Sequence, residues 1–171
     1  MGVYEAINET GTAFELVPAG YHALNSLRME KAYRHWGQDI SDEDSPIEAD
    51  LMFVVKMDKQ GGFLGRDALL RQLEAGRDRR LVQFQLRDPV PLLLHNEPIW
   101  RNNEIVGYIT SGMFGHTLGG AVGLGYVANP EGVDELYVES GEYEIEVAGE
   151  RFSAIASLRP LYDPLSERVR C

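Results

Sequence analysis

Glu30 is the side chain whose neighbours first suggest binding chemistry. It lies in the stretch LNSLRMEKAYRHWGQDISDEDSPIEADL, with Tyr33 and Trp36 close behind it. An ionised carboxylate accepts hydrogen bonds from two adjacent donors as a fork, and aromatic rings can wall a flat ligand. The alternative for Glu30 is an intrahelical pair with Arg34, four residues on, which contributes about 0.3–0.5 kcal/mol. Spacing alone favours this pair for Glu30, and core packing is an even alternative for both aromatic side chains.

Other side chains that could do chemistry give weaker signals. No carboxylate or cysteine stands at ligand spacing from any of the four histidines, His22, His35, His95 and His116. Ser111 lies outside a nucleophile-elbow pattern, so a serine triad is not supported. The sequence has no GxxxxGK, no GxGxxG between a strand and a helix, and no HExxH. We therefore assign no catalytic residue and no metal ligand.

The charge balance argues against some partners. The 171 residues include 27 Asp and Glu against 16 Lys and Arg, a net charge of −11. No basic stripe offsets this charge, so we expect no nucleic-acid binding. No run of about 18 apolar residues is present, so we expect no membrane span. The single cysteine, Cys171, fits a reducing compartment, and we expect a cytoplasmic location.

The first half of the chain favours helices. A first helix is expected to end at Gly11, and a second carries Leu24 and Leu27 at helical spacing, with both side chains expected in a core. The apolar run DLMFVVKM, residues 50–57, indicates a buried strand. A third helix with a leucine stripe is expected to close at Gly76.

The second half favours short strands separated by turns. The segments are RLVQFQL, EPIW, EIVGYITSG, GGAVGLGYV, DELYV, YEIEV and RFSAIAS. In YEIEV, the side chains of Tyr143, Ile145 and Val147 alternate with two glutamates, and Gly149 marks a hairpin turn. The charged stretch RDRR, residues 77–80, is the expected domain boundary. The pattern predicts an α+β protein whose second half is a small antiparallel barrel or sandwich.

Longer motifs resemble a known family. They comprise Gly20, Ala23, Leu27-Arg28, Glu30, Trp36-Gly37-Gln38-Asp39, Ser45-Pro46, Lys56, Phe63, Gly65-Arg66-Asp67-Ala68-Leu69 and the stretch VGYITSGMFGHTLGGAVGLGYV. These residues resemble the glycine-cleavage T-protein (aminomethyltransferase) family, from which the chain departs by having Gly115-His116 in place of Ser-Pro. The ending RPLYDPLSERVR resembles the FAD-dependent sarcosine and dimethylglycine dehydrogenases. The stretch KAYRHWG lacks the cysteine of the family's Fe–S-maintenance relatives, which disfavours that branch.

The resemblance implies a fold and a division of the chain. Residues 1–79 are expected to form the C-terminal part of a folate-binding α/β domain. Residues 80–171 are expected to form a small antiparallel, jelly-roll-like β-barrel domain.

The resemblance also implies roles for four residues in binding tetrahydrofolate. Glu30 would accept from the pterin N3–H and 2-amino groups, at about 2–4 kcal/mol, and this match reverses the preference for an Arg34 pair. Tyr33 and Trp36 would wall the pterin. Arg66 would lie near the anionic benzoyl-glutamate end, with a plain charge at a helix start as the even alternative.

The implied chemistry belongs to a larger parent enzyme. FAD, bound outside this segment, would oxidise an N-methyl group to an iminium, and tetrahydrofolate would capture the carbon as 5,10-methylenetetrahydrofolate. We expect a segment of a longer chain, inactive alone, completed by the N-terminal remainder of the parent or by a partner subunit. The alternatives are a fragment of a T-protein-type aminomethyltransferase and a non-catalytic docking module, for which exposed apolar surface is expected.

Overall fold

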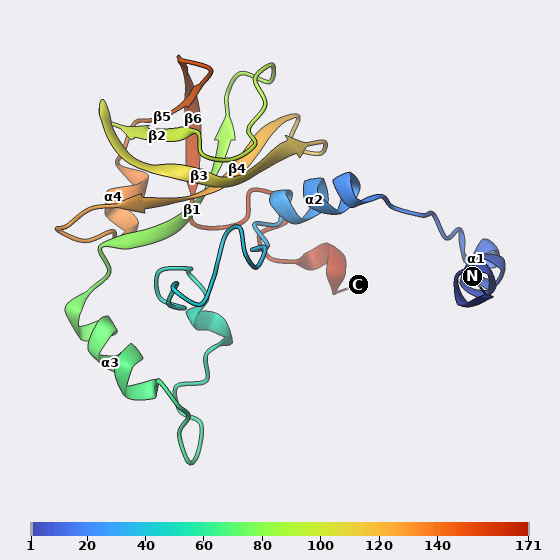
Figure 1. Ribbon diagram of the computed structural model, residues 1–171, viewed down its shortest axis with the longest axis horizontal. Helices are drawn as coiled ribbons and strands as arrows, with labels where there is room; N and C mark the ends of the chain where they lie inside the picture. Colours follow the sequence, from blue (N-terminus) through green and yellow to red (C-terminus); the bar gives the residue numbers. More distant parts are fainter. Residues whose placement is uncertain (1, 171) are drawn as a thin grey trace.

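A closed barrel of six antiparallel strands forms the second half of the molecule (Figure 1). The computed structural model describes residues 2–170, so Met1 and Cys171 lie outside it. The strands are β1 (Arg79–Leu86), β2 (Pro98–Arg101), β3 (Glu104–Gly115), β4 (Gly120–Ala128), β5 (Tyr143–Val147) and β6 (Glu150–Ser157). Their order around the barrel is β1-β4-β3-β2-β5-β6, and β6 pairs back with β1. The α+β class with an antiparallel barrel is therefore confirmed, and the sandwich alternative is wrong.

Alternating side chains and close backbone packing build the barrel core. Tyr143 and Ile145 of β5 point inward, as their alternation with glutamates predicts. Gly112 and Gly125 occur where the barrel interior is too crowded for a side chain. A Cβ on Gly112 would lie 2.5 Å from the carbonyl carbon of Leu93. These two glycines therefore mark close approach of neighbouring backbone and side chains.

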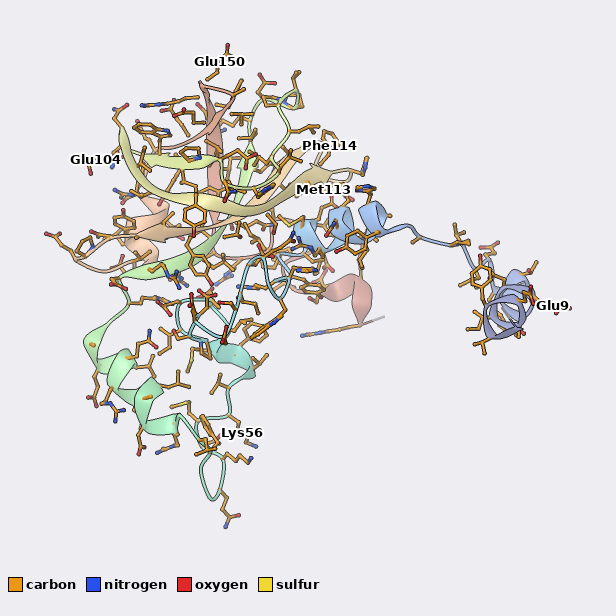
Figure 2. All side chains as sticks on the ribbon, viewed as in Figure 1. Glu9, Lys56, Glu104, Met113, Phe114 and Glu150 are labelled. Carbon is orange, nitrogen blue, oxygen red and sulfur yellow. The ribbon has the colours of Figure 1, made fainter. Side chains whose placement is uncertain are left out.

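The other regular elements of the described chain are helices and 3₁₀ turns. They are α1 (Gly2–Gly11), η1 (Thr12–Phe14), α2 (Tyr21–Glu30), η2 (Met52–Val54), α3 (Arg66–Ala75), α4 (Glu135–Glu139) and η3 (Glu167–Val169). α1 stands apart from the barrel at the end of an extended segment, and Glu9 marks it in Figure 2. α3 also lies away from the barrel. Within residues 2–170, no helix combines the length and apolar character needed to cross a membrane.

α2 is the helix that docks on the barrel. It buries Ser26, Met29 and Glu30 against β3 and β4. The Ser26 hydroxyl donates to the carbonyl of Phe114 over 2.7 Å, and Figure 2 shows Met113 and Phe114 at the end of β3 that faces α2. The docking surface on the helix is therefore one serine, one methionine and one carboxylate.

The charged stretch at 77–80 is a joint built from ion pairs. Arg79 Nη2 lies 2.5 Å from Asp44 Oδ1, and Arg80 Nη2 lies 2.8 Å from Asp50 Oδ1. Arg77 Nη1 lies 3.3 Å from the same Asp50 oxygen. These arginines attach the 44–50 loop to β1, whose first residue is Arg79. The division into domains at residues 79 and 80 stays a prediction.

Three local expectations are wrong. Leu24 and Leu27 are exposed, because α2 turns a different face toward the barrel. The run 50–57 forms a 3₁₀ turn at Met52–Val54 with an exposed phenylalanine, rather than a buried strand. DELYV forms α4, because the Asp134 carboxylate accepts from the backbone N–H of Tyr137 over 2.6 Å and caps the helix.

Candidate functional site

Glu30 is a buried carboxylate where three segments meet. It is the last residue of α2, and only 2% of its surface is exposed. Its Oε1 accepts from the backbone N–H of Thr117 (2.6 Å) and of Leu118 (3.0 Å), in the turn between β3 and β4. Its carbonyl oxygen lies 3.3 Å from the backbone nitrogen of Tyr162, in the C-terminal tail. Glu30 is therefore not a solvated helix charge, and part of its carboxylate holds the barrel turn.

The expected alternative partner of Glu30 is engaged elsewhere. α2 ends at Glu30, so Arg34 does not lie one helical turn further on. Arg34 donates to the carbonyl oxygens of Ala32 (2.9 Å), Ala49 (3.2 Å) and Asp50 (3.3 Å). Burial lowers the pKa of Arg34, and the charge of Asp50 acts in the opposite direction. The intrahelical pair is wrong as an explanation of Glu30.

The other three expected site residues do not gather around Glu30 in the described part of the chain. Tyr33 and Trp36 are 53% and 65% exposed, so core packing is wrong for both. Arg66 begins α3 and donates from Nε to the carbonyl of Met57 over 2.9 Å. In Figure 1, α3 lies away from α2 in a separate part of the molecule. The folate-binding roles of Tyr33, Trp36 and Arg66 stay predictions.

Asp39 is a second buried carboxylate, which the sequence analysis did not single out as a site residue. Its Oδ2 accepts from Arg28 Nη1 and from the backbone N–H of His35, both over 2.8 Å. Its Oδ1 accepts from the hydroxyls of Thr110 (2.6 Å) and Ser111. The Gly37-Gln38-Asp39 motif was the available signal, but it did not reveal that strand β3 supplies two donors. Asp39 ties the segment after α2 to the barrel.

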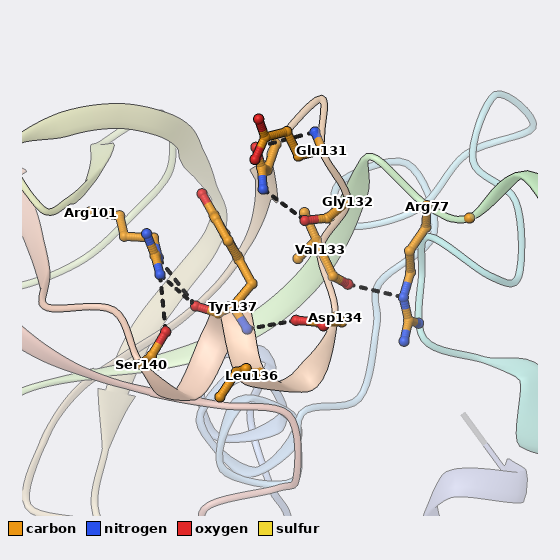
Figure 3. A pocket seen from close by; sticks show the side chains of 11 residues that line it. Arg77, Arg101, Glu131, Gly132, Val133, Asp134, Leu136, Tyr137 and Ser140 are labelled. Carbon is orange, nitrogen blue, oxygen red and sulfur yellow. Dashed lines mark hydrogen bonds between the residues drawn. The ribbon is translucent and has the colours of Figure 1, made fainter.

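Several cavities lie near charged side chains, and two of them adjoin Asp39 and α4. One of about 420 Å³ runs beside Asp39, between the 37–44 segment and the barrel. Burial, reinforced by Asp44, raises the pKa of Tyr126 at its wall. The second, of about 500 Å³, lies beside α4, with Arg77 and Arg101 at its edges (Figure 3). Neither cavity is lined by Glu30.

The arginines of the second cavity already hold the chain around α4. Arg101 donates from Nη2 to the carbonyl of Tyr137 over 2.9 Å, and its guanidinium lies 3.8 Å from the centre of the Tyr137 ring. Arg77 donates from Nε to the carbonyl of Val133 over 3.1 Å. These contacts show that Arg77 and Arg101 attach α4 and the segment before it to the rest of the molecule. Across residues 2–170, no three His, Cys, Asp or Glu side chains are grouped to hold a metal ion.

Comparison with known families agrees with this architecture. The fold is a closed antiparallel barrel with a helical segment packed against it. Residues 79–163 match the glycine cleavage T-protein C-terminal barrel domain, and residues 1–59 match the GCVT N-terminal domain. The chain belongs to the glycine-cleavage T-protein (aminomethyltransferase) family, so the resemblance of its sequence motifs to that family is confirmed.

Individual relatives are much longer than this chain. It is 46% identical to 4-methylaminobutanoate oxidase (formaldehyde-forming) of Paenarthrobacter nicotinovorans, over 99% of this chain and 20% of the relative. It is 41% identical to human mitochondrial sarcosine dehydrogenase, over 98% of this chain and 18% of the relative. The crystal structure of aminomethyltransferase T from Bartonella henselae superposes with a TM-score of 0.69 at 28% identity, covering 83% of this chain and 38% of that one. The chain is an aminomethyltransferase-type module that spans about a fifth of the first two relatives.

Proposed function

We propose that this module supplies part of a tetrahydrofolate site in a sarcosine- or dimethylglycine-dehydrogenase-like flavoenzyme. In such an enzyme, tetrahydrofolate provides the nitrogen that accepts a one-carbon unit from an oxidised N-methyl group. The similarity to a sarcosine dehydrogenase and to a formaldehyde-forming amine oxidase supports an amine-demethylating parent. A T-protein-type aminomethyltransferase is the alternative parent, supported by the structural match to aminomethyltransferase T.

The buried carboxylate of Glu30 is the observation that carries this proposal. Both hydrogen bonds from the 117–118 turn fall on Oε1, so Oε2 is the oxygen through which Glu30 would accept from a ligand. A pterin edge presents an N–H and an amino group side by side, and Oε2 would accept from these donors. The fork over both carboxylate oxygens that the sequence predicts is not available, because Oε1 already accepts two hydrogen bonds from the turn. Removal from bulk water strengthens such a charge-assisted bond. Glu30 therefore matches the pterin as a hydrogen-bond acceptor. The other walls of the site would come from surface outside this chain.

FAD does not fit the described elements. All pairings between the six strands are antiparallel, whereas a dinucleotide site of the Rossmann kind uses a parallel βαβ unit. We therefore propose that the flavin is held by another part of the parent and that this module alone is inactive. Human sarcosine dehydrogenase is mitochondrial by name, so a cytoplasmic location stays a prediction.

Glu30→Gln in the full-length protein tests the folate role. Glutamine keeps a carbonyl oxygen for the Thr117 and Leu118 N–H groups, so the turn is retained. Its amide nitrogen cannot accept from a pterin donor. We expect tetrahydrofolate affinity, measured anaerobically by calorimetry, to fall by about one to two decades, at about 1.4 kcal/mol per decade.

A matched control is Glu144→Gln on β5, where the carboxylate lies 3.8 Å from Arg151 and away from α2. Its folate affinity should equal that of the wild type. If Glu30→Gln also equals the wild type, Glu30 acts only as the cap of the barrel turn and the proposal is wrong.

A docking module without catalysis is the second candidate. Its support is the exposed apolar surface of the first two helices, where Val3, Ile7, Leu24 and Leu27 are all exposed. The same surface is expected if the remainder of a folate-binding domain covers these helices. Folate binding by the full-length protein separates the two, since a pure docking module would bind none.

A further inference from the structure

The C-terminal tail folds back onto the end of α2. The backbone N–H of Leu161 donates to Gln83 Oε1 over 2.8 Å, and Gln83 Nε2 lies 2.6 Å from the carbonyl oxygen of Met29. The backbone nitrogen of Tyr162 lies 3.3 Å from the carbonyl oxygen of Glu30. A buried barrel glutamine and the tail thus bond two carbonyl groups at the C-terminal end of α2, those of Met29 and Glu30.

Lys31, the residue after Glu30, is held by the same tail. Lys31 is 9% exposed, whereas the other two lysines, Lys56 and Lys59, are exposed. Its ammonium lies 2.6 Å from the carbonyl oxygen of Asp163, 3.3 Å from Asp163 Oδ2 and 3.2 Å from Ser166 Oγ. A buried ammonium is costly unless such acceptors surround it.

The tail adopts a backbone shape that suits these contacts. Asp163 and Ser166 have φ values of 46° and 53°, in a region that non-glycine residues enter only at a cost. Burial acts to raise the pKa of Asp163. Hydrogen bonds from the Glu167 N–H and from Lys31 outweigh it and lower that pKa. Geometry and charge both indicate a tail shaped around Lys31.

We propose that residues 160–166 are a strap that positions Glu30 for tetrahydrofolate. The strap contacts the Glu30 main chain and the Lys31 ammonium, while the 117–118 turn contacts the Glu30 carboxylate. Lys31 and Asp163 are positioning residues, because they act through Glu30 and contact no ligand. The inference rests on the proposed function and assigns a task to the tail motif RPLYDPLS.

Lys31→Met in the full-length protein tests the strap without folate. Methionine keeps most of the buried stem volume and removes all three polar contacts. If the strap positions Glu30, the amides of Thr117 and Leu118 lose a fixed acceptor. Their hydrogen exchange should then become about tenfold faster, as for about 1.4 kcal/mol of local stability. Lys59→Met is the matched control and should exchange as the wild type does.

Asp163→Asn is the milder variant in case Lys31→Met fails to fold. It keeps the main-chain carbonyl that accepts from Lys31 and removes only the charge, so a smaller change in the same direction is expected. Unchanged exchange of the 117–118 amides in the folded variants overturns the strap.

Tetrahydrofolate affinity then separates the strap from the folate proposal. Lys31→Met should weaken binding about fivefold to tenfold, and it should add no further loss in a Glu30→Gln background. Losses that simply add mean that Lys31 acts independently of Glu30 and overturn the strap. If Glu30→Gln leaves affinity unchanged, the folate proposal fails, while faster amide exchange in Lys31→Met still supports positioning of Glu30.

Discussion

At the residue scale, the candidate site contains two buried carboxylates, Glu30 and Asp39, which have different hydrogen-bond partners. Asp39 has donors on both oxygens, from Arg28 and the His35 N–H on one and from two hydroxyls on the other. The turn donates to Glu30 on one oxygen only. Saturated acceptors explain Asp39 as a structural group. The one-sided bonding of Glu30 is what makes it the candidate for a ligand.

Asp39→Asn should destabilise the module strongly. The side chain of Asp39 is fully buried, and that of its partner Arg28 is 11% exposed. Loss of the negative charge leaves a nearly buried guanidinium without its counter-ion, which costs about 3 kcal/mol. Urea unfolding followed by circular dichroism measures this as a lower midpoint at unchanged slope.

Asp58→Asn, an exposed carboxylate on the 57–65 loop, is the control for that experiment. Its midpoint should stay at the wild-type value. An unchanged midpoint in Asp39→Asn would show that the four donors around Asp39 are satisfied equally well by an amide.

The same scale shows how far sequence reasoning reaches into the site. Glu30 was identified through the motif that resembles the family, whereas spacing alone favoured an intrahelical pair with Arg34. Its contacts with Thr117 and Leu118 could not be anticipated, since they join residues more than eighty positions apart. Tyr33, Trp36 and Arg66 do not gather around Glu30 in the described part of the chain, and local sequence patterns do not encode which distant residues come together.

At the element scale, local patterns predicted the barrel better than the helical half. The alternation of YEIEV and the Gly149 hairpin are both present in the fold, because each strand has one face inside a closed barrel. DELYV contains strand-forming residues, yet the Asp134 cap decides for a helix. Hydrophobic periodicity identifies the apolar face of a helix or strand, but it does not identify the surface that packs against that face.

α2 illustrates that limit. Its apolar stripe at Leu24 and Leu27 is real, but the face on the barrel carries Ser26, Met29 and Glu30. The helix therefore has two faces that need partners, one polar and met by the barrel, the other apolar and exposed. An amphipathic pattern identifies the second face and overlooks the first.

At the scale of the whole molecule, the barrel is closed and the helical half is open. The barrel buries a continuous core, while α1 contacts mainly η1 and extends away from it (Figure 1). Isolated helices of ten residues are marginal in water. We therefore expect a partner surface to cover α1 and α2, either in the same polypeptide or in another.

The isolated 171-residue chain should accordingly bind tetrahydrofolate weakly or not at all. Only Glu30 of the expected folate-binding residues is buried, and neither cavity described above includes it. Anaerobic calorimetry should detect no binding at concentrations around ten micromolar. Micromolar affinity would mean that these residues already form a complete site.

The central claim is that Glu30 accepts from the amino-bearing edge of the pterin. The most direct measurement pairs tetrahydrofolate with its 2-desamino analogue on the full-length wild type and on Glu30→Gln. The wild type should lose about tenfold in affinity when the amino donor is absent, whereas Glu30→Gln should bind the two ligands about equally. Equal discrimination by both proteins would show that another group recognises the pterin and that Glu30 serves the barrel turn alone.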